Sequence, residues 1–210
     1  MTRTRIKICG LTREEDLAAA VDAGVDAVGL VMVPASPRFI ALQHAAMMRR
    51  RVPAFVQVVA LLMDAEPDWV AAVCDGLQPD LLQFHGRETP AACESAGRPY
   101  LKALAMAGAE VDLAAESRRY ASAAGLLLDG HGAGEMGGSG QAFAWQRAAS
   151  DAELPLILAG GLKADNVGQA IREARPYGVD VSSGVESAPG IKDHRKIRQF
   201  VEEVRKSDVS

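Results

Sequence analysis

Residues 155–185 read PLILAGGLKADNVGQAIREARPYGVDVSSGV, and this stretch indicates the fold class. It begins with a short apolar run (155–159), passes through two glycines into a helical pattern (164–172), and ends in a second short run (178–182). Two short strands joined by a helix form a unit whose strands are parallel. The stretch therefore predicts a parallel sheet that is covered by helices.

The same alternation continues through the rest of the chain. Strands are expected at residues 5–9, 26–32, 55–63, 81–85, 100–105, 125–129, 155–159 and 178–182. Helices are expected at residues 12–23, 40–51, 67–75, 89–96, 111–121, 164–172 and 193–206, with a weaker helical pattern at 143–149. Eight strands that alternate with helices favour a closed (β/α)8 barrel, the TIM barrel. An open doubly wound sheet is the alternative, but its usual roughly five or six strands would leave two runs unexplained.

The sequence shows no composition break or charge block that would mark a second domain. We therefore expect residues 1–210 to form a single α/β barrel domain. The first expected helix opens with Thr12-Arg13-Glu14-Glu15, a pattern that predicts a capping box at its N-terminus.

The composition is that of an ordinary globular protein, with 49% hydrophobic and 24% charged residues. A formal net charge of -4 gives no electrostatic reason to expect a nucleic-acid partner. We find no signal peptide and no run near the roughly 20 apolar residues that span a bilayer, so no membrane partner is expected. The cysteines (Cys9, Cys74 and Cys93) are widely spaced without a metal-ligand rhythm, which favours a reducing, cytoplasmic location.

Strand parity predicts which side chains point into the barrel, because side chains alternate between the two faces of a strand. Helices would cover the aliphatic face of each strand. The side chains on the other face therefore point into the barrel. By this rule the inward side chains at the C-terminal strand ends are Cys9, His85, Asp129 and Ser182. Barrel enzymes hold their active sites at this end.

Glycine-rich segments follow the last three strands. They are Gly137-Gly138-Ser139-Gly140, Ala159-Gly160-Gly161-Leu162 and Ser182-Ser183-Gly184-Val185. Glycines let backbone N–H groups converge on an anion, and barrels commonly bind phosphate in the loops after strands seven and eight. One such segment would be an ordinary turn, but three at the expected strand ends predict a phosphate site.

Cys9 and Asp129 are the candidate acid–base pair. Taken alone, Cys9 can be read as a small buried hydrophobe and Asp129 as a carboxylate that caps a loop. Together they place a thiol and a carboxyl group at one barrel mouth beside a phosphate site, which suits proton transfer. His85 also faces inward, but no cluster at ligand spacing accompanies it, so no metal is expected.

Two lysines, Lys7 and Lys102, lie on expected strands at positions whose side chains should point into the barrel. Either could form a Schiff base if burial lowered its pKa, but we favour pairing with internal carboxylates. Strand eight closes against strand one, and Lys7 and Asp180 each lie two residues below the barrel mouth. We therefore expect the two side chains within hydrogen-bonding range, where the pair would favour the thiolate form of Cys9.

The motifs of the chain resemble those of the phosphoribosylanthranilate isomerases, in the expected order and over essentially the whole length. The matching motifs are Lys7-Ile8-Cys9-Gly10-Leu11-Thr12, Ser36-Pro37-Arg38-Phe39, Gln83-Phe84-His85-Gly86, Leu127-Leu128-Asp129, Gly137-Gly138-Ser139-Gly140, Ala159-Gly160-Gly161-Leu162, Asn166-Val167, Asp180-Val181-Ser182-Ser183-Gly184-Val185-Glu186, Pro189-Gly190 and Lys192-Asp193. Gly130 departs from the family pattern, in which Thr or Ser usually follows the aspartate.

The resemblance implies an Amadori rearrangement of N-(5-phosphoribosyl)anthranilate, a step of tryptophan biosynthesis that needs no cofactor or metal. It implies that Asp129 is the general acid, that Cys9 is the general base, and that Arg38 binds the anthranilate carboxylate. The phosphate would be bound by Gly138, Ser139, Gly160, Gly161, Ser183 and Gly184. Strand parity, rather than the resemblance, makes Lys7, His85 and Asp180 candidates for supporting roles.

Two alternatives remain at this point. A related barrel isomerase of histidine biosynthesis would be expected to use two inward carboxylates and a doubled phosphate motif, whereas this chain has Cys9 on its first strand. A non-catalytic barrel that binds a phosphorylated ligand would need no thiol opposite a carboxylate. The sequence allows either a monomer or a homodimer.

Overall fold

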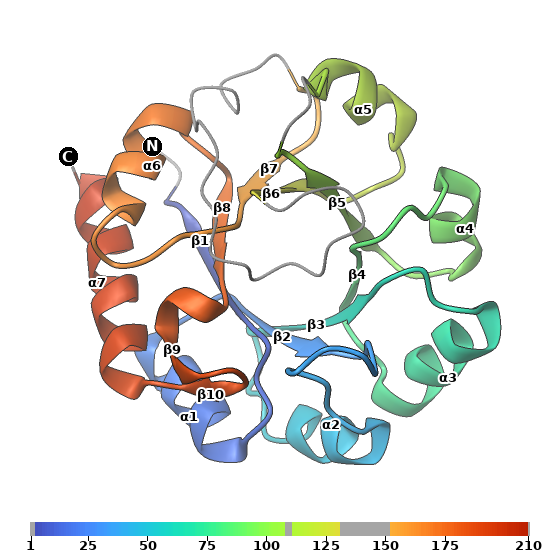
Figure 1. Cartoon of the computed structure of the whole chain (residues 1–210), viewed down its shortest axis with the longest axis horizontal. Coiled ribbons are helices and arrows are strands. Elements are labelled where there is room, and N and C mark those ends of the chain that lie inside the picture. Colours follow the sequence, from blue (N-terminus) through green and yellow to red (C-terminus); the bar gives the residue numbers. More distant parts are fainter. Residues whose placement is uncertain (1–2, 108–110, 131–151, 210) are drawn as a thin grey trace.

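The structure is a computed structural model that describes residues 3–107, 111–130 and 152–209. Eight parallel strands close into a barrel in the order β1 to β8, and helices surround it (Figure 1). The strands are β1 (Arg5–Cys9), β2 (Ala27–Val31), β3 (Gln57–Leu62), β4 (Leu81–Phe84), β5 (Tyr100–Ala105), β6 (Gly125–Asp129), β7 (Leu156–Leu158) and β8 (Gly178–Val181). The described helices are α1 (Glu14–Ala23), α2 (Leu42–Arg49), α3 (Pro67–Leu77), α4 (Pro90–Ser95), α5 (Leu113–Arg119), α6 (Val167–Ala174) and α7 (His194–Val209).

The expected (β/α)8 barrel is confirmed, and the open-sheet alternative is wrong because β1 pairs with β8 and closes the sheet. The bounds of β1, β5 and β6 match the expected ones, and the other strands are shorter by a few residues at most. The helix expected at 143–149 lies outside the described residues.

The hydrophobic core has two parts. The larger lies between the strands and the helices, and it includes fully buried side chains such as Ile8, Leu82 and Phe200. The smaller consists of Leu101, Ala103, Leu127, Ile157 and Ala159 on β5, β6 and the end of β7. Burying one such aliphatic side chain stabilises the fold by about 1.5–3 kcal/mol.

The smaller cluster corrects the expected orientation of Lys102. Leu101 and Ala103 face the barrel interior, so Lys102 has the opposite parity and lies in the outer layer. Its Nζ is 2.9 Å from Glu88 Oε2 and 5.9 Å from the centroid of the Tyr120 ring. Lys102 does pair with a carboxylate, but not inside the barrel.

The capping box expected at the start of α1 is also wrong. Arg13 is the N-cap residue and makes no side-chain capping bond. Thr12 instead donates from Oγ1 to the carbonyl oxygen of Gly190, at 2.6 Å. Gly190 belongs to the turn of a small hairpin, β9 (Glu186–Ala188) and β10 (Ile191–Lys192), which the sequence did not predict.

The hairpin follows a short 3-10 helix, η2 (Ser183–Val185), and lies against the first turn of α1. Asp16 of α1 accepts a hydrogen bond from the backbone N–H of Lys192, at 3.0 Å. The segment after β8 is therefore fixed to the first βα unit, at the end of the barrel where the strands finish (Figure 1). No helix in the described part of the chain is long and apolar enough to cross a membrane.

Candidate functional site

A cavity opens at the C-terminal ends of the strands, with an empty volume of about 680 Å³ that includes its open mouth. The expected site residues that line it are Cys9, Arg38, His85, Asp129, Gly160, Gly161, Asp180, Ser182, Ser183 and Gly184. Lys7 lies below this cavity and lines a second one at the other end of the barrel. Gly138 and Ser139 lie outside the described residues.

Cys9 ends β1 and is 5% exposed. It pairs with Gly29 of β2, where a β-carbon would lie only 2.7 Å from Cys9 Sγ, so glycine is what leaves room for the thiol. Burial raises the pKa of the Cys9 thiol, and the charge of Asp180 adds to this, while Lys7 and Lys192 oppose it without cancelling it. The expected preference for the thiolate is therefore wrong for the ligand-free protein.

The expected pair of Lys7 and Asp180 is confirmed. Lys7 Nζ lies 2.7 Å from Asp180 Oδ2, and both side chains are 7% exposed. Burial lowers the pKa of Lys7, but Asp180 and, to a lesser degree, Cys9 together outweigh it and leave the pKa above its ordinary value. A lysine held protonated is a poor nucleophile, which argues against the Schiff-base role.

Asp129 ends β6, and His85 follows the end of β4. His85 Nε2 lies 3.4 Å from Asp129 Oδ2, and both side chains are buried. On its other side, His85 Nδ1 lies 3.0 Å from Gln83 Nε2. The tautomer that fits this contact accepts at Nδ1 from the amide nitrogen and carries its ring proton on Nε2, on the side of Asp129.

Gln83 is therefore a site residue that the sequence analysis missed. It is 1% exposed and shares the inward face of β4 with His85, two residues further on. The available signal was strand parity, which places a buried amide next to an inward histidine.

The loops after β7 and β8 form one wall of the cavity. Gly160 and Gly161 have φ values of 76° and 67°, which few other residues adopt without strain. Asn166 fixes this turn, because its Nδ2 donates to the carbonyl oxygen of Gly161 at 2.9 Å. A β-carbon on Gly184 would collide with the carbonyl oxygen of Leu162, so Gly184 lets the two loops touch.

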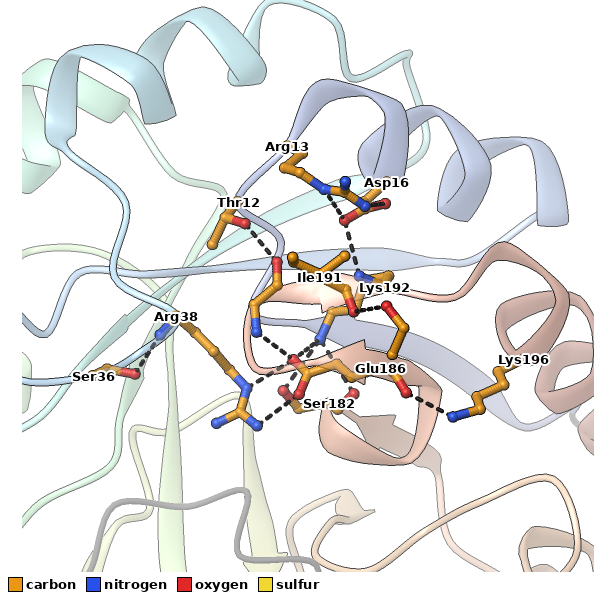
Figure 2. A network of polar contacts seen from close by, with 12 residues as sticks. Thr12, Arg13, Asp16, Ser36, Arg38, Ser182, Glu186, Ile191, Lys192 and Lys196 are labelled. Atoms are coloured by element: carbon orange, nitrogen blue, oxygen red, sulfur yellow. Dashed lines mark hydrogen bonds and ion pairs between the residues drawn. The ribbon is translucent and has the colours of Figure 1, made fainter.

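Arg38 reaches the cavity from the loop between β2 and α2 and is held by a carboxylate (Figure 2). Its Nε and Nη2 donate to the two carboxylate oxygens of Glu186, at 2.9 and 2.8 Å. Lys192 Nζ lies 2.7 Å from the same carboxylate. Glu186 and Lys192 stand in the motifs of the resemblance but had no predicted role, because they lie on a hairpin whose strands are too short to show an alternating pattern.

Within the described residues, no three His, Cys, Asp or Glu side chains gather closely enough to hold a metal ion. The cavity thus brings together a thiol, a carboxyl group with an imidazole beside it, a guanidinium and a pair of glycine-rich loops. Such a set can move protons at a ligand that carries anionic groups.

Comparisons with known proteins agree with this chemistry. The family model of N-(5'phosphoribosyl)anthranilate (PRA) isomerase matches residues 6–203. N-(5'-phosphoribosyl)anthranilate isomerase of Bordetella pertussis is 52% identical over 214 residues, which cover 98% of each chain. The crystal structure of phosphoribosyl anthranilate isomerase from Thermotoga maritima has a TM-score of 0.88 and 36% identity, and it covers 97% of this chain and 99% of its own.

Two further structures, each with a TM-score of 0.85, add information on ligand and assembly. One is phosphoribosyl anthranilate isomerase in complex with reduced 1-(o-carboxyphenylamino)-1-deoxyribulose 5-phosphate, 34% identical. The other shows mutually generated monomers of the dimeric phosphoribosylanthranilate isomerase from Thermotoga maritima, 33% identical. Each match covers 97% of this chain and 99% of the other.

Proposed function

Because the chain belongs to the N-(5'-phosphoribosyl)anthranilate isomerase family, we propose that Cys9 and Asp129 are the base and the acid of its reaction. The protein is an isomerase of tryptophan biosynthesis that converts phosphoribosylanthranilate into the corresponding aminodeoxyribulose phosphate. The observation that carries the residue assignment is that the thiol and the carboxyl group end β1 and β6 and line the same cavity.

The proposed reaction has one proton transfer at Asp129 and one at Cys9, followed by a tautomerisation. Asp129, in its acid form, gives its proton to the ring oxygen as the bond from that oxygen to C1 breaks, which leaves a protonated Schiff base. The Cys9 thiolate then removes the C2 proton, and the electrons of that bond form an enolamine. The enolamine tautomerises to the ketone as C1 takes a proton and the C2 hydroxyl gives one up, so the product is an isomer of the substrate.

Neighbouring side chains have supporting roles in this proposal. The Nε2–H of His85 faces Asp129 and stabilises the carboxylate that remains after proton transfer. Lys7, fixed by Asp180, opposes the effect of burial on Cys9. Arg38 binds the anthranilate carboxylate, for which its guanidinium is the suited partner at this mouth.

The phosphate is proposed to lie at the loops after β7 and β8, on Gly160, Gly161, Ser183 and Gly184. Gly138 and Ser139 complete this assignment on sequence grounds. The complex of the relative with a reduced product analogue supports a ligand that carries both a carboxylate and a phosphate.

The remaining proposals concern the whole chain. We infer one domain, because β1 pairs with β8 and the family match spans residues 6–203. The dimeric relative supports a homodimer. The three cysteines are free and buried, which supports a cytoplasmic location.

The histidine-pathway alternative is less well supported, since it expects a carboxylate where the cavity has the Cys9 thiol. The test is a fluorescence assay that follows the loss of phosphoribosylanthranilate with the purified protein. Turnover is expected with and without a chelator such as EDTA, because no step uses a metal. Turnover that EDTA abolishes, or turnover of the histidine-pathway ribonucleotide alone, would contradict the proposal.

A further inference from the structure

Glu186 has no part in the proton transfers, yet it is the centre of a buried network at the cavity (Figure 2). Its carboxylate accepts from Arg38 Nε and Nη2, from Lys192 Nζ at 2.7 Å and from the Gly190 backbone N–H at 3.2 Å. The residue is 8% exposed. A buried carboxylate with both oxygens occupied by cations is fixed in place, because each bond restricts its rotation.

The contact with Arg38 uses one edge of the guanidinium and leaves the rest available. A guanidinium has five N–H groups, and two of them go to Glu186, which leaves three. No described residue accepts a hydrogen bond from Nη1, and Figure 2 draws no contact from that nitrogen. A second carboxylate can therefore bind Arg38 while Glu186 still holds the Nε edge.

Charge favours an anionic ligand at this position. Arg38 and Lys192 bring two positive charges, and Glu186 brings one negative charge, so the cluster keeps one net positive charge. Arg38 and Glu186 have side chains that are 11% and 6% exposed, so solvent screens their charges only in part.

Lys192 connects the cluster to the proposed phosphate side. Its Nζ lies 3.2 Å from the carbonyl oxygen of Ser182, which directly precedes the turn of Ser183 and Gly184. Glu186 itself directly follows η2. One carboxylate thus links the loop that brings Arg38 to the loop that borders the phosphate.

We propose that Glu186 is a positioning residue that orients Arg38 for the carboxylate of the substrate, with Lys192 holding Glu186 in place. This inference rests on the proposed role of Arg38. Glu186 acts through Arg38 and does not touch the reacting atoms.

The test compares two ligands that differ only in the carboxylate. One is reduced 1-(o-carboxyphenylamino)-1-deoxyribulose 5-phosphate, and the other is its phenylamino counterpart without the carboxyl group. Titration calorimetry on the full chain measures both. Glu186→Gln should weaken binding of the carboxylate ligand by about tenfold, or ~1.4 kcal/mol, and leave the second ligand within about twofold.

Three results would overturn the inference, and one of them is a Glu186→Gln protein that prefers the carboxylate ligand as strongly as the wild type does. Equal weakening of both ligands means that Glu186 only supports the fold, and tighter binding of the carboxylate ligand means that it only offsets the charge of Arg38. If Glu186→Gln fails to fold, Glu186→Asp replaces it in the test. The aspartate keeps the negative charge but is too short to reach all the partners of Glu186. It should also weaken binding of the carboxylate ligand and leave binding of the second ligand unchanged. Glu203→Gln removes an exposed carboxylate of α7 that pairs with Lys206, and it is the matched control, with no effect on either ligand.

Arg38→Met separates this inference from the assignment on which it depends. That variant should bind the two ligands with similar affinity, because the carboxylate has lost its partner. If Arg38→Met still prefers the carboxylate ligand, the role of Arg38 is wrong. If Arg38→Met loses the preference but Glu186→Gln keeps it, only the role of Glu186 is wrong.

Discussion

At the scale of single residues, the protonation of Cys9 controls what the site can do. A general base must lose its proton before it can accept one, and burial raises the pKa of the Cys9 thiol above its ordinary value. Lys7, Lys192 and Asp180 act on the thiol from the surrounding strands and the hairpin. The free protein therefore holds Cys9 as the thiol at neutral pH.

This predicts a pH dependence that Cys9 itself causes. The ratio of the wild-type kcat/KM to that of Cys9→Asp should still rise above about pH 8.5, the ordinary pKa of a thiol, because the thiolate fraction is still increasing there. Loss of the Asp129 proton lowers both values alike and cancels in the ratio. The measurement is kcat/KM of both proteins from fluorescence loss across the pH range in which they stay folded; a carboxylate at position 9 loses its proton far below neutral pH. A ratio that stays level would show that the protonation of Cys9 does not control the rate.

At the scale of elements, the seam between β1 and β8 closes the barrel and contains the buried pair of Lys7 and Asp180. The two residues are direct partners in the register of the strands, so their approach follows from strand order and parity alone. Removing one partner of a buried pair leaves an isolated charge, which costs about 3–5 kcal/mol.

A double-mutant cycle tests this seam. Lys7→Met and Asp180→Leu should each lower the free energy of unfolding by more than the double variant does, because the double variant leaves no unpaired charge. Denaturant unfolding of the four proteins gives the coupling. Additive losses would mean that the two charges do not stabilise one another.

The strands were predictable from the sequence because their apolar runs, and the alternation of inward and outward side chains along them, extend over enough residues to form a recognisable pattern. The same reasoning placed Cys9, Asp129 and His85 at one mouth. It failed for Lys102, because both faces of β5 are apolar and its partner Glu88 lies in a loop. It also assigned no role to Glu186, since the short hairpin strands show no alternating pattern and Arg38, its partner, is distant in the sequence.

At the scale of the whole molecule, the two ends of the barrel differ. The C-terminal end bears the cavity with Cys9 and Asp129, while the segment before β3 exposes the ring of Phe55 fully to solvent. Phe55 also has φ of 72°, which is costly for a bulky residue. A strained and exposed aromatic residue suits a contact with a second copy of the chain better than a monomer surface.

The proposed homodimer is therefore expected to depend on Phe55. Light scattering of the wild-type protein should give twice the mass of one chain, and Phe55→Ser should shift this toward a single chain. Turnover should persist in the variant, because the cavity with Cys9 and Asp129 lies at the other end of the barrel. A wild-type protein with the mass of one chain would refute the dimer.

The central claim is that Cys9 and Asp129 perform the acid–base chemistry of phosphoribosylanthranilate isomerisation. Turnover of Cys9→Ala and of Asp129→Asn, followed by loss of substrate fluorescence, tests it most directly. Each variant should lose about two to four powers of ten in kcat, the usual contribution of a positioned acid or base, while its thermal unfolding stays near that of the wild type. A folded Cys9→Ala protein that keeps more than about a tenth of the wild-type turnover would contradict the account.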